Sequence, residues 1–364
     1  MPILDQGYQH WKGSLKGHAW RWVAITRQGA RAQFKNRWVW ALFVISCIPA
    51  LVLSAFLVLW GLFEQKSTLL TPFLFLIQGL PDELRAGPRG FRATFWSLAF
   101  DLFLGVQIYM SMVLVLLVGP ELISQDLRFN AMPLYFSRPV RRLDYFAGKL
   151  GIIAAYLSAV TVVPVLLAYV LGVAFSLDPL VIRDTWRVLV GSLLFSAIVV
   201  LSAGTLILAV SSLSRNSRYV AALWIGIWIL SETSAGVLYG TIHREWCPLL
   251  SYTANLGRMR QTLLDAENSR HKVTALLQAG ESQFRRAAPP GPFGRGRSGF
   301  HVGIGHVPPA PSPPVRVELG PGEGTDDDTS EAYPWQWSAG ILAGLVGLSL
   351  WILSTRVRSL DRLR

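Results

Sequence analysis

Few residues of this chain have the type and spacing that catalysis or nucleotide binding requires. The segment AGKLG at 147–151 contains the Gly-Lys pair of a phosphate-binding loop. It lacks the upstream glycine and the following Ser or Thr that such a loop uses to cradle phosphate. His301 and His306 form H-x-x-x-x-H in a Gly- and Pro-rich segment, where a metal site would need further ligands. The sequence therefore predicts no catalytic residue, no cofactor, no metal site and no nucleotide site of its own.

Two acidic residues, Asp101 and Glu232, lie inside long apolar runs. A charge inside a bilayer costs about 2.5–3.5 kcal/mol on insertion scales, so each carboxylate needs a partner or water. One interpretation makes both residues candidates for lining a substrate pathway. The other interpretation gives each a helix-to-helix hydrogen bond or a place at the membrane interface.

The composition is that of a membrane protein. Of the 364 residues, 52% are hydrophobic and only 15% are charged, whereas soluble proteins carry about 25% charged residues. The formal net charge of +12 does not indicate nucleic-acid binding, because the basic residues flank apolar runs and do not gather on a polar surface with stacking aromatics. Cys47 and Cys247 are too few for a disulfide framework or a metal cluster.

The apolar runs predict an all-α, polytopic membrane protein with six transmembrane helices. A helix of about 20 residues crosses a hydrocarbon core of roughly 30 Å. Runs of this length occupy residues 38–62, 95–118, 150–175, 188–211, 220–242 and 337–355. Pro49 and Pro164 lie within the first and third runs, where the loss of a helical hydrogen bond is expected to kink the helix.

The distribution of basic residues predicts the orientation. The segments on one side hold eighteen Lys and Arg residues, and the short segments on the other side hold six. The first side comprises residues 1–37, 119–149, 212–219 and 356–364, and the second comprises 63–94 and 176–187. By the positive-inside rule, both termini are expected in the cytoplasm. This basic side would also attract anionic lipid, by about 1 kcal/mol per basic residue.

Two further segments are predicted to lie outside the spans. Residues 1–37 contain a basic amphipathic pattern in which Trp22 and Phe34 share a face, as expected for a helix in the membrane interface; the alternative is a charged leader that only sets topology. Residues 243–336 form a long extracytoplasmic loop. Its first part, from about 246 to 286, shows an amphipathic pattern that would rest on the outer leaflet or dip into it, and about 287–333 is expected to be disordered.

The loop between the second and third runs, residues 119–149, is polar and punctuated. Leu122, Ile123 and Leu127 share one face of a predicted short amphipathic helix within 119–131. After it, Ser137-Arg138-Pro139 resembles a helix start, with the proline in the first turn, where its missing N–H is harmless. We expect this second helix to continue through Asp144, Gly148 and Lys149 into the third run.

The ordered motif G-P-E-L-I-S-x-D-x-R … L-Y-x-S-R-P-V-x-R-x-D-Y-x-x-G-K, flanked by two spans, resembles the first cytoplasmic loop of type-2 ABC exporter permeases. The similarity in layout extends over about residues 14–260 and 337–364. The segment 287–333 departs from the short outer loop usual in that family. The resemblance implies a transmembrane subunit that docks a separate ABC ATPase through residues 119–149, and two permease copies paired with two ATPase copies, either as a homodimer or as two related chains.

The resemblance also implies roles for individual residues. Glu121, Asp126 and Arg128 would make charged contacts with the ATPase or with the N-terminal helix. The geometry of re-entry into the membrane would be set by Ser137, Arg138, Pro139, Arg142, Asp144, Gly148 and Lys149. An alternative without an ATPase contact remains for each of them: the arginines satisfy the positive-inside rule, the proline starts a helix and the glycine permits close packing.

The sequence thus predicts a permease subunit of an ATP-driven exporter, integral to the cytoplasmic (inner) membrane. Its parts are the N-terminal segment 1–37, spans one to five in 38–242, the loop 243–336, the sixth span 337–355 and a basic tail 356–364. One alternative is a non-transporting membrane scaffold that anchors an ATPase or a maturation complex. Another is a polytopic lipid-modifying enzyme, although no motif of such chemistry is present.

Overall fold

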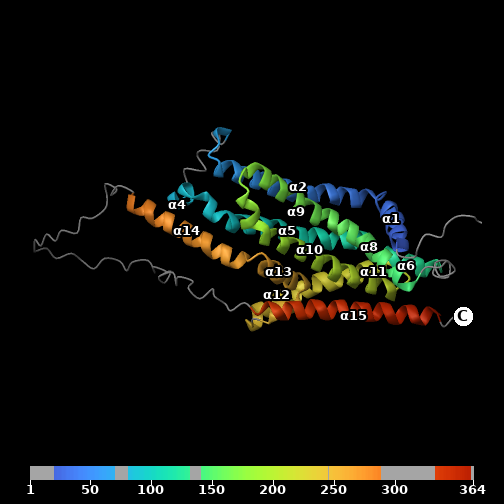
Figure 1. The fold of residues 1–364 in the computed structure, drawn as a ribbon. Coiled ribbons are helices and arrows are strands. Elements are labelled where there is room, and N and C mark those ends of the chain that lie inside the picture. Colours follow the sequence, from blue (N-terminus) through green and yellow to red (C-terminus); the bar gives the residue numbers. More distant parts are fainter. Residues whose placement is uncertain (1–19, 70–80, 132–140, 245, 288–332, 362–364) are drawn as a thin grey trace, which may run out of the picture.

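The computed structural model describes residues 20–69, 81–131, 141–244, 246–287 and 333–361, and among these it contains helices and no strand. Six of the helical segments are long and apolar enough to cross a membrane, which confirms the predicted all-α architecture with six spans. The six are Arg37–Glu64, Pro88–Arg128, Leu143–Ser176, Leu180–Leu213, Ser217–Ile242 and Trp335–Arg356. They lie side by side in one elongated bundle (Figure 1).

The helices follow one another in an up-and-down order. The first half of the chain contains α1 (Arg21–Gln33), α2 (Arg37–Glu64), α4 (Asp82–Ala86), η3 (Pro88–Phe91), α5 (Arg92–Val118) and α6 (Glu121–Arg128). The next helices are α8 (Arg142–Val160), α9 (Val162–Ser176) and α10 (Leu180–Leu213). The last third contains α11 (Ser217–Ile225), η4 (Gly226–Leu230), α12 (Ser231–Ile242), η5 (Cys247–Leu250), α13 (Tyr252–Leu263), α14 (Ala266–Ala287) and α15 (Trp335–Asp361).

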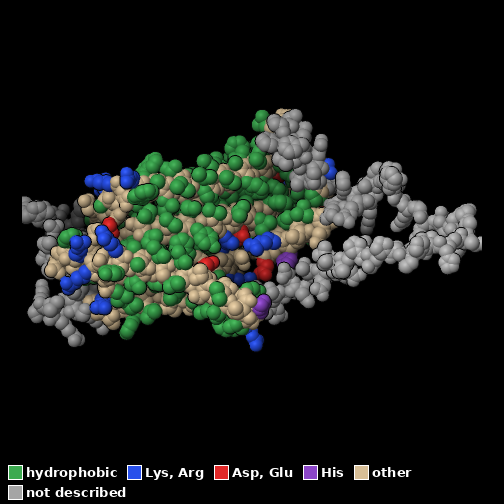
Figure 2. Space-filling model, turned by 180° about the vertical axis from the view of Figure 1, so that it is seen from behind, with side chains coloured by type: hydrophobic (Ala, Val, Ile, Leu, Met, Phe, Trp, Pro, Cys, Tyr) green, Lys and Arg blue, Asp and Glu red, His purple; other side chains and the backbone are tan. Residues whose placement is uncertain are grey.

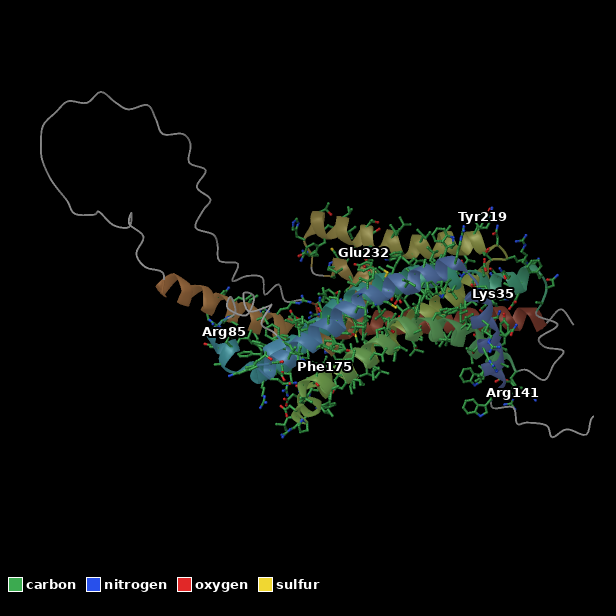
Figure 3. The ribbon with its side chains drawn as sticks, turned by 90° about the horizontal axis from the view of Figure 1, so that it is seen from above. Lys35, Arg85, Arg141, Phe175, Tyr219 and Glu232 are labelled. Atoms are coloured by element: carbon green, nitrogen blue, oxygen red, sulfur yellow. The ribbon has the colours of Figure 1, made fainter. Side chains whose placement is uncertain are left out.

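The bundle has two distinct ends. Lys35, Arg141 and Tyr219 lie at one end, which we call the α6 end, and Arg85 and Phe175 lie at the opposite end, the α4 end (Figure 3). α1 meets α2 at a steep angle at the α6 end and packs along α8 (Figure 1). α14 continues beyond the α4 end of the bundle (Figure 1).

α10 forms the centre of the bundle. It packs against α5, α8, α9, α13 and α15, and its Ser192 and Ser196 donate to carbonyls of the preceding turn, as Ser192 does to Val188 at 2.7 Å. The outer helices keep large apolar side chains on the surface; Leu102, for example, is 70% exposed and Trp351 is 63% exposed. Such side chains are stable where lipid replaces water.

The prolines of the first and third spans differ in their effect. α2 continues through Pro49 without interruption from Arg37 to Glu64. The third span is divided at Thr161 into α8 and α9, three residues before Pro164. Because a proline disrupts the turn that precedes it, the break falls where a proline kink is expected. The fifth span is also irregular, with a π-helical turn over Gly226–Leu230.

The segment after the fifth span turns back into the bundle. α13 packs against α5, α10 and α15, and Tyr252 at its start bonds through its hydroxyl to Ser202 of α10 at 2.8 Å. The indole of Trp224 lies 6.5 Å from the Tyr252 ring, centroid to centroid. Residues 252–264 therefore lie between spans. The amphipathic pattern had suggested a helix on or in the outer leaflet, and the packing of α13 among helices of the bundle is a contact that the pattern did not predict.

Candidate functional site

Helix α6, the first helix of the loop 119–149, is fixed at its first turn to α10 in the centre of the bundle. The Ser211 hydroxyl of α10 accepts hydrogen bonds from the backbone N–H groups of Ile123 at 3.2 Å and Ser124 at 3.1 Å. It donates to the carbonyl oxygen of Pro120 at 3.0 Å. The first N–H groups of a helix have no partner within that helix, so a residue of another helix supplies the cap that a local Ser or Asp often provides.

The far end of α6 is fixed to α8 by a nearly buried ion pair. The Lys149 ammonium lies 2.6 Å from Oδ2 of Asp126, and the Tyr145 hydroxyl donates to the same oxygen at 2.6 Å. The side chains of Lys149 and Asp126 are 10% and 14% exposed. The structure thus brings together Asp126 and Lys149, two residues of the predicted loop set that lie far apart within the loop 119–149.

Gly148 allows α1 to lie directly on α8. A Cβ at this position would stand 2.7 Å from Cβ of Ile25, closer than real side chains approach. The hydroxyl of Thr26 donates to the carbonyl oxygen of Gly148 at 3.0 Å. About two turns further along α8, the Tyr156 hydroxyl donates to the carbonyl oxygen of Ala30 at 2.7 Å. The predicted close packing at Gly148 involves the N-terminal helix.

The other predicted loop residues are less enclosed. Glu121 and Arg128 are exposed on α6, and the Arg128 guanidinium lies 5.6 Å from the ring centre of Phe129. Phe129 itself is 71% exposed, a feature that its place in the sequence did not single out. The Asp144 carboxylate accepts a hydrogen bond from the backbone N–H of Arg141 at 3.1 Å and thereby caps α8.

The remaining residues of the predicted loop set are only partly covered. Ser137, Arg138 and Pro139 lie outside the described residues. Arg142 is the first residue of α8, and its side chain is not described.

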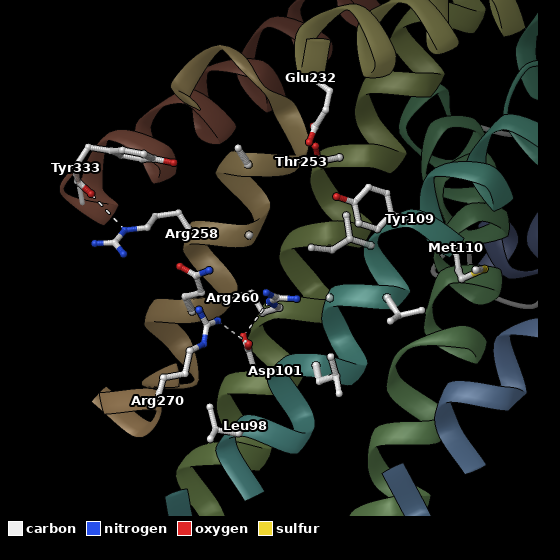
Figure 4. A pocket seen from close by; sticks show the side chains of 17 residues that line it. Leu98, Asp101, Tyr109, Met110, Glu232, Thr253, Arg258, Arg260, Arg270 and Tyr333 are labelled. Atoms are coloured by element: carbon white, nitrogen blue, oxygen red, sulfur yellow. Dashed lines mark hydrogen bonds and ion pairs between the residues drawn. The ribbon is translucent and has the colours of Figure 1, made fainter. Parts of the chain in front are cut away.

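Asp101, predicted to need a partner, has two. Its carboxylate lies 3.0 Å from Nε of Arg260 on α13 and accepts a hydrogen bond at 2.9 Å from Nη2 of Arg270 on α14 (Figure 4). The Arg260 guanidinium lies over Gly105, where a side chain would occupy its place. One carboxylate thus faces two guanidinium groups.

Glu232 lies on the opposite wall of the same cavity. Its carboxylate accepts a hydrogen bond from the Ser251 hydroxyl at 2.6 Å. The cavity, which we call the polar chamber, has a volume of about 910 Å³. Its charged and aromatic lining residues are Asp101, Tyr109, Glu232, Arg258, Arg260, Arg270 and Tyr333. Figure 4 shows these side chains converging from α5, α12, α13, α14 and the residues just before α15. In Figure 2, acidic and basic side chains interrupt an otherwise apolar face.

A second buried charge cluster joins three spans at the α4 end. The Arg92 guanidinium is 1% exposed and bonds to both carboxylate oxygens of Glu64, at 2.8 and 2.6 Å. It also bonds to Asp178 at 3.0 Å and Asp184 at 3.1 Å. From the sequence alone, Arg92 counts only as a basic residue of the outer loop. Its carboxylate partners lie 28 to 92 positions away, and no local sequence pattern indicates such distant contacts.

A family model described as ABC-2 family transporter protein matches residues 23–288, which include the loop 119–149, the first five spans and α13. No curated protein shows a significant match to the chain.

Proposed function

Because the chain belongs to the ABC-2 family of transporter proteins, we propose that it forms the membrane pathway of an ATP-driven exporter and docks its ATPase through residues 119–149. The family makes the chain an integral, multi-pass permease component of an ABC transporter, and it implies an ABC ATPase subunit as partner. The direction of transport and the docking of the ATPase at residues 119–149 are the parts that we propose. Nucleotide hydrolysis is assigned to the partner, since the sequence holds no P-loop.

The observation that carries the proposal is the way α6 is fastened. It follows α5 directly, is capped by Ser211 of α10, and is paired through Asp126 with Lys149 of α8. α8 in turn holds α1 through Gly148. A displacement of α6 would therefore be transmitted to three spans and to the N-terminal helix at once, because packed interiors have low compressibility and transmit strain.

We infer that the ATPase contacts the exposed side of α6. That side presents Glu121, Gln125, Arg128 and the exposed ring of Phe129. Aromatic and arginine side chains are the residues that most often dominate binding energy at protein interfaces. Asp126, Asp144, Gly148 and Lys149 act as positioning residues within the permease. Ser137, Arg138, Pro139 and Arg142 retain the predicted role in the geometry of re-entry.

The orientation follows from the same proposal. The ATPase is cytoplasmic, so the α6 end faces the cytoplasm and both termini lie on that side of the inner membrane. α1 then lies at the inner surface, where Arg27 and Arg31 are exposed to anionic lipid and Trp20 is 74% exposed. We further propose that two permease copies, identical or related, pair with two ATPase copies, and that Asp101 and Glu232 line the pathway.

Co-reconstitution with the ATPase tests this function against the scaffold alternative. A permease should change ATP turnover and move a solute, whereas a scaffold should bind the ATPase without flux. Phe129→Ser together with Arg128→Ala should weaken ATPase binding at least tenfold. The matched control is Arg187→Ala, which removes an exposed arginine that lies 5.8 Å from the Trp186 ring near the α4 end. Equal ATPase binding by both variants would refute docking at this loop.

A further inference from the structure

The polar chamber has an apolar neighbour across a single ridge of α5. Leu98, Leu102 and Val106, which follow one another at intervals of one helical turn, line both hollows. On one side of the ridge lie Asp101 and Gly105 with the arginines of α13 and α14. On the other side lies an apolar hollow of about 550 Å³ between α2 and α5. Leu102 on the ridge is 70% exposed, so both hollows open onto the same face.

Around Asp101, the polar chamber carries a local excess of positive charge. Arg260 and Arg270 share the single carboxylate of Asp101, whereas Arg258 is paired with Glu267 at 2.9 Å. The side chain of Arg260 is 13% exposed and contacts Asp101 through Nε. The Arg270 side chain beside it is 49% exposed, and a planar guanidinium is well suited to a carboxylate or phosphate oxygen pair. Glu232, the other acid of the lining, is bonded to Ser251 on the opposite wall.

The apolar side offers no polar partner to a ligand. Its lining consists of aliphatic and aromatic side chains from α2 and α5, among them Val52, Phe56 and Ala99. A hydrocarbon chain could occupy such a hollow without leaving any donor or acceptor unsatisfied.

We propose that the two hollows together bind the exported cargo, and that this cargo is an amphiphile with a long hydrocarbon tail and an anionic head group. Arg260 and Arg270 would hold the head group in the polar chamber, and the tail would cross the α5 ridge into the apolar hollow. This assignment rests on the proposed transport function, of which it specifies the substrate class. Such a site should select ligands that have both parts, because the polar chamber does not suit a hydrocarbon tail and the apolar hollow does not suit a charged head group.

Photoaffinity labelling of the purified full-length permease in phosphatidylcholine nanodiscs tests the assignment. The probe is a long-chain fatty acid with a diazirine at its tail end, and crosslinked peptides are mapped by mass spectrometry. Crosslinks are expected on the segments of α2 and α5 that line the apolar hollow. Unlabelled oleate should compete at least tenfold more strongly than oleyl alcohol, which has the same tail and no charge.

Two independent variants separate the two halves. Arg260→Gln should weaken oleate competition about tenfold to a hundredfold, the range expected for loss of a hydrogen bond to a charged group. Ala99→Trp should block tail crosslinking, and Val52→Trp fills the hollow from the other wall if the first variant fails to fold. Arg187→Gln, outside both hollows, should leave labelling unchanged. Equal labelling of all variants, or equal competition by the alcohol, would overturn the assignment. Because the ATPase is absent from this assay, a failure of ATPase docking would not affect it.

Discussion

The ion pair between Asp126 and Lys149 offers the sharpest test of how α6 is held. In Asp126→Asn the side chain keeps its size and can still accept the Tyr145 hydroxyl, so the change removes only the negative charge 2.6 Å from the Lys149 ammonium. An exposed pair is worth about 0–1 kcal/mol, whereas breaking a buried pair costs about 3–5 kcal/mol. With side chains 10% and 14% exposed, this pair lies nearer the buried limit, and we expect a loss of about 2–3 kcal/mol.

That loss should appear as local opening of α6 and not as global unfolding. Hydrogen exchange of the α6 amides, measured in nanodiscs, should become about 30- to 150-fold faster if opening and closing are rapid. The acceleration should be greatest from Gln125 to Arg128. The first turn should respond less, because the Ser211 cap on Ile123 and Ser124 remains in place.

Lys149→Met and the double variant complete a mutant cycle. The double variant should recover part of the loss, because it leaves no unpaired charge between α6 and α8. An acceleration below threefold in Asp126→Asn, or one that is uniform along α6, would refute the view that this pair fastens the second half of the helix.

Three further predictions concern other contacts. Gly148→Leu should displace α1 from α8, because its side chain would meet Ile25, and crosslinking between cysteines placed on the two helices should fall sharply; Gly257→Leu, at a position with open space, is the control. Arg92→Met should leave the nearly buried carboxylate of Glu64 without its cationic partner and reduce the stability of the permease by about 3–5 kcal/mol. Thermal unfolding should therefore begin at a lower temperature, and an unchanged transition would contradict this. The Leu180 N–H and the Arg92 guanidinium hold the pKa of Asp178 below its ordinary value. The ionised Asp178 therefore stabilises the fold above the ordinary carboxyl pKa, and this stabilisation should be lost as the pH falls through the lowered pKa. Acid titration of wild type against Asp178→Asn should show this difference, and identical acid profiles would exclude it.

Much of the fold could be predicted because the bilayer imposes a simple length requirement. Runs such as 188–211 are mostly apolar and contain no charged residue, and each lies within one of the six spans. The proline rule likewise locates the break at Thr161, just before Pro164. The amphipathic pattern around Leu122 and Ile123 similarly indicated a short helix, which is α6.

The tertiary contacts of the candidate site could not be predicted in the same way. Asp101 is recognisable as an acid that needs a partner, but Arg270 lies 169 positions away in a segment whose depth the sequence left open. Ser211 is one serine in an apolar run, and nothing local indicates that it caps a helix 87 positions earlier. Such roles depend on which helices become neighbours, and hydropathy carries no information about neighbours.

Docking of a cytoplasmic ATPase requires that the exposed tip of α6 lies on the cytoplasmic side of the membrane. In a chain with Cys47 and Cys247 replaced by Ala, a single cysteine would be placed at Phe129, and in a second variant at Leu177, which is 78% exposed at the opposite end of the bundle. In inside-out vesicles, a membrane-impermeant maleimide should label Phe129→Cys and leave Leu177→Cys unlabelled. The reverse pattern would place α6 on the outer side, where no ATP-driven subunit could reach it, and would contradict the account.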